Sequence, residues 1–236
     1  MARKALAEFL GTALLLVAVI GSGIAAARLS PNDVGLDLLE NAAATSAALI
    51  ALILAFGPVS GGHFNPAVTL VERLFGGLTN REAATYVGSQ LAGGVTGALL
   101  ANAMFALPTL QLSTRTRSSG PLWLAEVVAT FGLLMTIYGV VRSGRASAAP
   151  FAVGAYIGGA YFFTSSTSFA NPAVTISRML SNTFAGIKPS SAPAFIAAQL
   201  IGAGLAAGAI AVLYPSAAEH AAEVVLPQPD HQEAPR

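Results

Sequence analysis

The 236-residue chain contains no cysteine and few charged residues. The absence of cysteine excludes disulfide bonds, cysteine-ligated metals and thiol catalysis. Only 10% of the residues are charged, whereas soluble domains average about 25%. The formal net charge is +1, so nothing in the charge balance points to nucleic acid or to an acidic partner. The composition predicts a protein whose partner is the lipid bilayer, and we expect no cofactor and no metal.

The charged residues are also spaced unevenly along the chain. The stretches without Asp, Glu, Lys or Arg are 9–27, 41–71, 83–114, 127–141, 146–177 and 189–218. About 20 mostly apolar residues cross the hydrocarbon core of a bilayer as a helix. The pattern therefore predicts membrane-spanning helices at 5–27, 37–57, 83–106, 121–141, 149–167 and 192–213.

The first of these segments has an alternative interpretation. A cleaved signal peptide also begins with basic residues, here Arg3 and Lys4, followed by an apolar run and small residues. Glu8 interrupts that run, and the "AE" at its start recurs at 125–126. We therefore favour a retained first helix.

The sequence Asn-Pro-Ala-Val-Thr occurs twice, at 65–69 and 171–175. Each copy lies in a charge-free stretch too long for one span. The 31 residues of 41–71 would reach about 46 Å as a helix, against a hydrocarbon core of about 30 Å. We expect short helices at 66–75 and 172–181, each about 15 Å long, which complete one further span end to end.

The chain also repeats itself over longer distances. The segment "LAEFLGT" at 6–12 resembles "LAEVVAT" at 124–130, and the two NPA boxes lie 106 residues apart. Each half reads as helix, helix, box, helix. Since three spans per half is an odd number, the second half enters the membrane upside down, and the functional site of such an inverted repeat lies near the midplane.

These features predict an all-α membrane protein with six transmembrane helices and two re-entrant half-helices. A single channel domain covers 1–214, with repeat one at 3–106, a linker at 107–120 and repeat two at 121–214. The polar tail 215–236 is expected to be disordered.

The two boxes have a clear physical meaning as helix starts. Asn is a preferred N-cap residue, and Pro is favoured at the first helical position. If each Asn caps its own helix, its NH2 group points into the lumen, where the helix start also carries about half a positive charge. Such a lumen suits neutral solutes with oxygen lone pairs and repels cations. An ordinary turn is the better interpretation of one copy, but not of two inverted copies. The expected pore residues are Asn65, Pro66, Ala67, Asn171, Pro172 and Ala173.

The segments "AEFLGT", "SGGHFNPAVT", "AEVVAT" and the second "NPAVT" together resemble the aquaporin, or major intrinsic protein, family. The resemblance covers about residues 3–214. It implies six tilted helices, one pore per protomer and a homotetramer. It also implies a passive channel for small uncharged solutes such as water and glycerol-like polyols, with no enzymatic activity, in the cell (inner or plasma) membrane.

The chain departs from this family after the second box, where Val174 replaces the usual filter Arg. Family spacing then places the other filter positions at Thr45, Gly159 and Ser168. This ring has no aromatic wall and no fixed cation, so we expect a wide opening. Bacterial members without the Arg are linked to metalloid acids such as arsenous acid, which we offer as a hypothesis. Arg178 either adds positive potential to the vestibule or, as we favour, reaches towards lipid headgroups.

Several buried polar residues have two possible roles. Glu8 and Glu126 either relay protons or cations in a secondary transporter, or accept hydrogen bonds from the re-entrant loops. Their equivalent positions in the repeat favour the structural role. His63 either senses pH or packs beside the pore, and we favour packing. Gln90 and Gln199 are expected to bond across helices.

Two glycine motifs, Gly93-xxx-Gly97 and Gly204-xxx-Gly208, are expected to allow close helix crossing. The basic residues give a further expectation, about orientation. One side collects Arg3, Lys4, Arg73, Arg81, Arg142, Arg145 and Arg236, and the other Arg28, Arg115, Arg117, Arg178 and Lys188. This asymmetry favours cytoplasmic termini.

Overall fold

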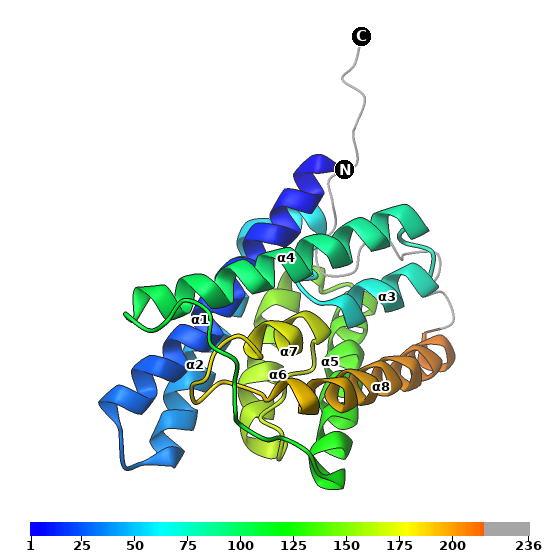
Figure 1. The fold of residues 1–236 in the computed structure, drawn as a ribbon. Helices are drawn as coiled ribbons and strands as arrows, with labels where there is room; N and C mark the ends of the chain where they lie inside the picture. The colour runs from blue at the N-terminus through cyan, green and yellow to red at the C-terminus, as the bar shows by residue number, and fades with distance from the viewer. Residues whose placement is uncertain (215–236) are drawn as a thin grey trace.

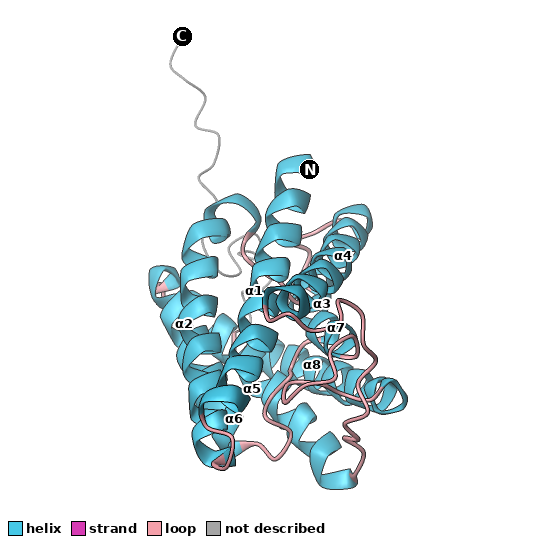
Figure 2. Ribbon diagram, turned by 60° about the vertical axis from the view of Figure 1, so that its left-hand side comes forward, coloured by secondary structure: helices cyan, strands magenta, loops and turns pink. Residues whose placement is uncertain are grey.

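The computed structural model describes residues 1–214, and within that range every regular element is helical (Figures 1 and 2). The α-helices are α1 (Ala2–Leu29), α2 (Val34–Ser60), α3 (Pro66–Leu74), α4 (Asn80–Met104), α5 (Gly120–Arg142), α6 (Ala149–Phe163), α7 (Pro172–Arg178) and α8 (Ala192–Leu213). Short 3-10 turns at Ala146–Ala148 and Pro189–Ser191 precede α6 and α8. The predicted tail 215–236 lies outside the described residues.

Two of the long helices, α2 and α4, begin where polar side chains cap them. Asp33 accepts a hydrogen bond from the backbone N–H of Leu36 (2.9 Å) and starts α2. Thr79 and Glu82 form a capping box at the start of α4, so that two otherwise unpaired N–H groups are satisfied. The six long helices match the predicted spans closely. The main difference is α6, which ends at Phe163 rather than 167 because Thr164 adopts an extended conformation that starts the second box loop.

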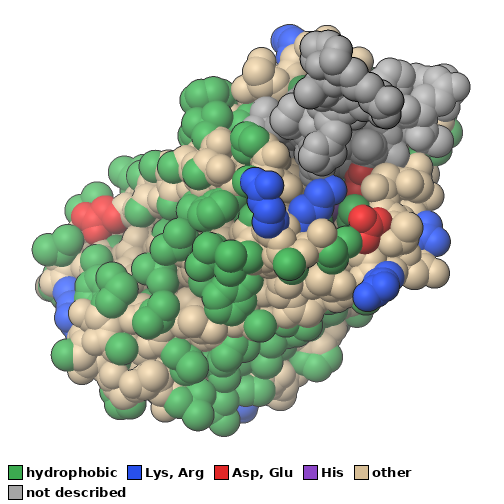
Figure 3. Space-filling view, turned by 90° about the horizontal axis from the view of Figure 1, so that it is seen from above, with side chains coloured by type: hydrophobic (Ala, Val, Ile, Leu, Met, Phe, Trp, Pro, Cys, Tyr) green, Lys and Arg blue, Asp and Glu red, His purple; other side chains and the backbone are tan. Residues whose placement is uncertain are grey.

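Five segments are long and apolar enough to cross a membrane, namely Ala2–Leu29, Val34–Ser60, Gly120–Arg142, Ala146–Phe163 and Pro189–Leu213. Helix α4 has sufficient length, with 25 residues, but it carries more polar side chains. It packs extensively along α1, and its polar side chains Gln90 and Asn102 are buried inside the protein. Hydrophobic side chains cover much of the face shown in Figure 3, with charged residues in a few places.

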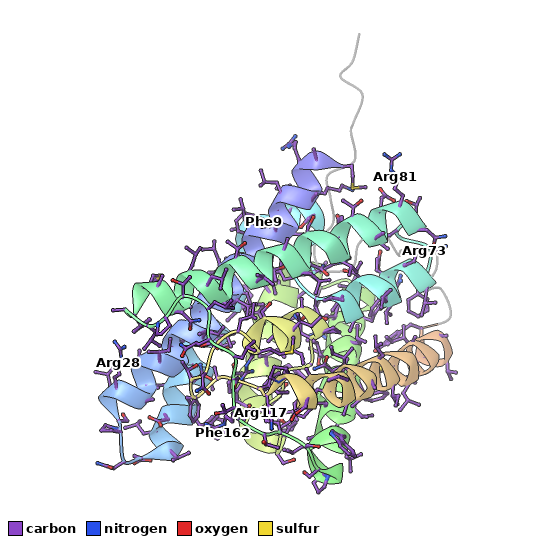
Figure 4. All side chains as sticks on the ribbon, viewed as in Figure 1. Phe9, Arg28, Arg73, Arg81, Arg117 and Phe162 are labelled. Carbon is purple, nitrogen blue, oxygen red and sulfur yellow. The ribbon has the colours of Figure 1, made fainter. Side chains whose placement is uncertain are left out.

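The two halves of the described chain share one element order, and both half-helices lie at the centre. Helix α1 packs mainly on α4, and α5 mainly on α8, while α2 contacts α6 and α3 contacts α7 (Figure 1). Arg73 and Arg81 lie at the end of the bundle near the N-terminus, and Arg28 lies at the opposite end (Figure 4). We call these the termini end and the linker end, since the long loop 105–119 belongs to the latter.

Glycines permit the closest helix crossing. A Cβ at Gly93 would collide with the carbonyl oxygen of Phe9, and one at Gly97 with that of Ala13. The expectation for Gly204 and Gly208 is wrong, because nothing lies within 4 Å of a Cβ at either position. In the second half Gly202, two residues earlier, faces the carbonyl oxygen of Val127 instead. A two-residue offset on a helix moves a side chain to nearly the opposite face.

These contacts predict opposite effects of one substitution at two glycines. Gly97→Ala should lower the free energy of unfolding by about 1–3 kcal/mol, because the new methyl group overpacks the crossing of α1 and α4. The matched control Gly204→Ala should leave stability unchanged or raise it slightly, since Ala is the better helix former. Thermal unfolding in detergent measures both, and equal melting temperatures for the two variants would contradict the packing.

Candidate functional site

The half-helices α3 and α7 begin at the two boxes, where each is capped by its own Asn. The Oδ1 atom of Asn65 accepts from the backbone N–H of Ala67 at 2.9 Å. The Oδ1 atom of Asn171 accepts from Ala173 at 2.9 Å and from Val174 at 3.2 Å. Pro66 and Pro172 occupy the first helical positions, where a missing N–H costs nothing.

The amide groups of the same two residues join the boxes to each other. Asn65 Nδ2 donates to the carbonyl oxygen of Ala170 at 2.8 Å, and Asn171 Nδ2 donates to that of Phe64 at 2.8 Å. We call this pair of hydrogen bonds the clasp. An amide NH2 carries two hydrogens, so each Asn uses only one of them in the clasp. Both residues also line the central cavity, where the second hydrogen is available to a solute.

The loops before the boxes have an unusual backbone. Phe64 and Ala170 both have φ of 47°, a left-handed conformation that costs a non-glycine residue about 1–3 kcal/mol. This conformation presents their carbonyl oxygens to the clasp. Their backbone N–H groups then need acceptors from outside the loop, because neither a helix nor a sheet pairs them inside the membrane.

Glu8 supplies those acceptors in the first half. Its Oε1 atom accepts from Ser60 Oγ at 2.6 Å and from His63 N at 3.0 Å, and its Oε2 atom accepts from Phe64 N at 2.8 Å and from Gln90 Nε2 at 2.7 Å. Glu8 is 0% exposed. Two of the four donors are backbone N–H groups of the loop, which is the arrangement expected of a structural support.

Glu126 repeats this arrangement in the second half. It accepts from Phe169 N and Ala170 N, both at 2.9 Å, and from Gln199 Nε2 at 2.6 Å. Gln199 also donates to Thr175 Oγ1 at 2.8 Å, as Gln90 does to Thr69 Oγ1 at 2.9 Å. The two glutamines therefore bond from α4 and α8 to the half-helices.

His63 lies at the termini end of the cavity and is buried. Its Nδ1 atom is 3.0 Å from Thr69 Oγ1, and its ring packs against Tyr86 with centroids 5.2 Å apart. These contacts match the packing role rather than an exposed pH sensor.

The cavity between the half-helices has a volume of about 60 Å³. One water needs about 10–15 Å³ of such space, so a short file of small molecules fits. The cavity lining is largely apolar, with Leu15, Leu49 and Leu133 among its residues. Its polar groups come from the box loops and from Thr45, Tyr161 and Arg178 on the helices.

Three of the four expected filter residues, Thr45, Ser168 and Val174, line the cavity, but Gly159 does not. Gly159 is exposed, and a Cβ there would meet only the ring of Phe163. Helix α6 instead presents Val153, Ile157 and Tyr161 to the cavity. Their spacing of four residues marks one helix face, which the fixed family spacing did not take into account.

The cavity also contains aromatic side chains and a cation, which the four expected filter residues do not supply. Tyr161 donates its hydroxyl to Thr45 Oγ1 at 3.2 Å, and Phe169 lines the same end. Arg178 is 2% exposed and lines the cavity, so the expectation that it reaches towards headgroups is wrong. The loops that cover it bring the carbonyl oxygen of Ala185 to its Nε atom. The available signal was its position four residues after Val174, on the same helix face.

The fold and site define an all-helical membrane protein in which two opposed half-helices meet at a cavity. The sequence profile of the family described as Major intrinsic protein matches residues 1–170. The chain therefore belongs to the major intrinsic protein, or aquaporin, family.

Individual relatives agree with this assignment. The chain is 50% identical over 203 residues to the aquaglyceroporin AqpS of Rhizobium meliloti (strain 1021), and the match covers 86% of this chain and 86% of the relative. It is 32% identical over 165 residues to aquaporin TIP1-1 of Arabidopsis thaliana, covering 66% of this chain and 65% of the relative. The X-ray structure of the aquaglyceroporin from Plasmodium falciparum matches with a TM-score of 0.69 and 20% identity, over 91% of this chain and 97% of that one. The predicted fold class is confirmed.

The loop supports predict a graded loss of stability. Glu126→Ala leaves three buried donors without their acceptor, at about 1–3 kcal/mol each, so the protein should unfold at a much lower temperature in detergent. Glu126→Gln keeps one acceptor oxygen and should fall between Ala and wild type. An Ala variant as stable as wild type would contradict the support role.

Proposed function

We propose that the protein is a passive transmembrane channel for small uncharged solutes, namely water and glycerol-like polyols. One observation carries this proposal: the two amide groups of Asn65 and Asn171 face one cavity from opposed helix starts. The names of two similar proteins, aquaglyceroporins of Rhizobium meliloti and Plasmodium falciparum, agree with the polyol part.

The geometry accounts for passage and for selectivity against charge. A solute oxygen accepts the free hydrogens of Asn65 and Asn171 while its other side slides along apolar wall residues. The two helix starts add positive potential at the same point, which opposes cations. A water held by both amides is oriented so that a proton-conducting chain is broken.

A secondary transporter is the second candidate, since it would also have broken helices and an inverted repeat. Its coupling-ion site would require Glu8 or Glu126. Both carboxylates already accept from three or four donors of the protein, which leaves them poor ion ligands. We therefore expect downhill flux that needs no ion gradient, and no enzymatic activity.

The finer features follow from the family. We place the channel in the cell membrane with cytoplasmic termini, as a homotetramer with one pore in each protomer. Each pore is one domain, residues 1–214, built from repeats 3–106 and 121–214 around the linker 107–120. Arsenous acid, which is neutral near pH 7 and similar to a polyol in shape, remains a candidate solute.

The direct test is a stopped-flow panel with water, glycerol, urea and arsenous acid on liposomes that contain the purified protein. We expect faster equilibration of water and glycerol than in empty liposomes, with or without a proton or sodium gradient. Vesicles closed to all four solutes would reject the channel, and flux that requires an ion gradient would favour the transporter.

A substitution at Val174 tests the filter position. Val174→Arg should lower glycerol permeability about tenfold, equivalent to about 1.4 kcal/mol of barrier, while water still passes, because a guanidinium fills the opening. Val174→Met is the matched control for length without charge and should have a smaller effect. A Val174→Arg channel with unchanged glycerol permeability would place Val174 outside the narrow part of the path.

A further inference from the structure

Arg178 is a buried cation without a carboxylate partner among residues 1–214. It is the last residue of α7, where its charge is favoured by the helix C-terminus. Its Nε atom donates to the carbonyl oxygen of Ala185, but neither terminal nitrogen donates to any of the described residues. An unpaired buried charge costs several kcal/mol, so this one calls for a function.

Ser168 lines the same cavity and carries a second unsatisfied group. Its Oγ atom is buried and has no hydrogen-bond partner among the described residues. The residue has φ of 50°, and the N–H of Ser168 donates to Ser166 Oγ at 3.2 Å. The loop is therefore held in a strained shape in which the hydroxyl of a cavity-lining residue makes no bond to the protein.

Phe169 fixes the arginine in place. The Cζ atom of Arg178 lies 3.4 Å from the centroid of this ring, and the Cζ atom of Arg117 lies 5.1 Å from it. Such contacts are worth about 2 kcal/mol when desolvated. The ring is braced in turn by Phe195, with centroids 5.2 Å apart, and the backbone N–H of Phe169 donates to Glu126.

Arg117 belongs to the long loop 105–119 (Figure 4) and attaches this loop to the loops before and after α7. Its guanidinium donates to the carbonyl oxygens of Gly186 at 3.0 Å, Ser166 at 3.4 Å and Phe184 at 3.4 Å. Each nitrogen of Arg117 therefore donates to backbone, whereas the terminal nitrogens of Arg178 make no such bond and Arg178 lines the cavity. Of the two arginines at Phe169, Arg178 is the one free to meet a solute.

We propose that Arg178 and the hydroxyl of Ser168 form the solute-selecting site at the linker end of the cavity. Arg178 supplies there the fixed cation and hydrogen-bond donors that the chain lacks at Val174. The inference rests on the proposed channel function and names residues that decide its selectivity.

This site differs in kind from the clasp at the boxes. Arg178 lies about 6 Å along the helix axis from Val174, so a solute meets it before the Asn amides. The guanidinium donates through rigid, forked N–H groups, and Ser168 both accepts and donates. A hydroxyl-bearing neutral solute satisfies both groups at once, and a cation is repelled.

Four variants in liposomes separate charge from hydrogen bonding, with two readouts: the ratio of glycerol to water permeability, and the leak of sodium and methylammonium. Arg178→Gln should lower the ratio about fivefold, the size that one lost hydrogen bond gives, and should raise the cation leak. Arg178→Lys keeps the charge but not the fork, so only the ratio should fall.

Ser168→Ala should lower the ratio of glycerol to water permeability by a similar factor and should leave the cation leak unchanged. The matched control is Arg115→Gln, in the loop 105–119, where the side chain is exposed and packs on Phe184; neither readout should change. If Arg178 had only a structural role, its substitution would lower all fluxes together. The Arg178→Lys and Arg178→Gln variants would then have the same cation leak.

Wild-type ratio and leak in both Arg178→Gln and Ser168→Ala would overturn the site. If Arg178→Gln yields no folded protein, Arg178→Lys and Ser168→Ala decide, and unchanged ratios in both overturn it. Wild-type vesicles closed to water, glycerol and urea would instead reject the channel function itself, so the two failures are distinguishable.

Discussion

The amide–carbonyl clasp between the two boxes is the interaction on which the rest of the structure depends. Asn65 bonds to Ala170, and Asn171 bonds to Phe64, both at 2.8 Å. These bonds hold two short helices tip to tip, although a nine-residue and a seven-residue helix are too short to be stable alone. The clasp also fixes the one point where both helix starts face a common lumen.

A buried clasp of this kind requires support, because the backbone N–H groups of the two loops belong to no helix or sheet that would pair them inside the membrane. The chain provides the support twice, with Glu8 and Gln90 in one half and Glu126 and Gln199 in the other. The carboxylates hold the strained backbone, and the glutamines tie the half-helices to α4 and α8. Polar residues that would suggest ion transport in isolation thus serve to keep a pore open.

Much of this was predictable from the sequence, because it depends on local chemistry. The helix starts at Asn65 and Asn171 follow from capping preferences, and the internal repeat pairs Glu8 with Glu126. The filter was harder, because a helix's rotation is set by packing. Gly159 and Tyr161 lie two residues apart and so on nearly opposite faces of α6, and a fixed spacing across loops selected the one that does not line the cavity.

Arg178 shows a second limit of the sequence. A lone arginine near the end of a span is ordinarily placed at the lipid headgroups. Its burial depends on contacts with Phe169 and Ala185, which lie in the loops before and after α7. The sequence indicates the helix face of Arg178 but not how these irregular loops fold over it, and it does not indicate the Gly202 crossing on α8.

The most direct measurement is a high-resolution experimental density map of the protein in lipid, with its ordered waters. The account predicts that the Nδ2 atoms of Asn65 and Asn171 lie within hydrogen-bond distance of the opposite carbonyl oxygens. It also predicts a file of waters that passes both amides and reaches Arg178. A map in which the two amides lie apart, or in which the waters bypass them, would contradict it.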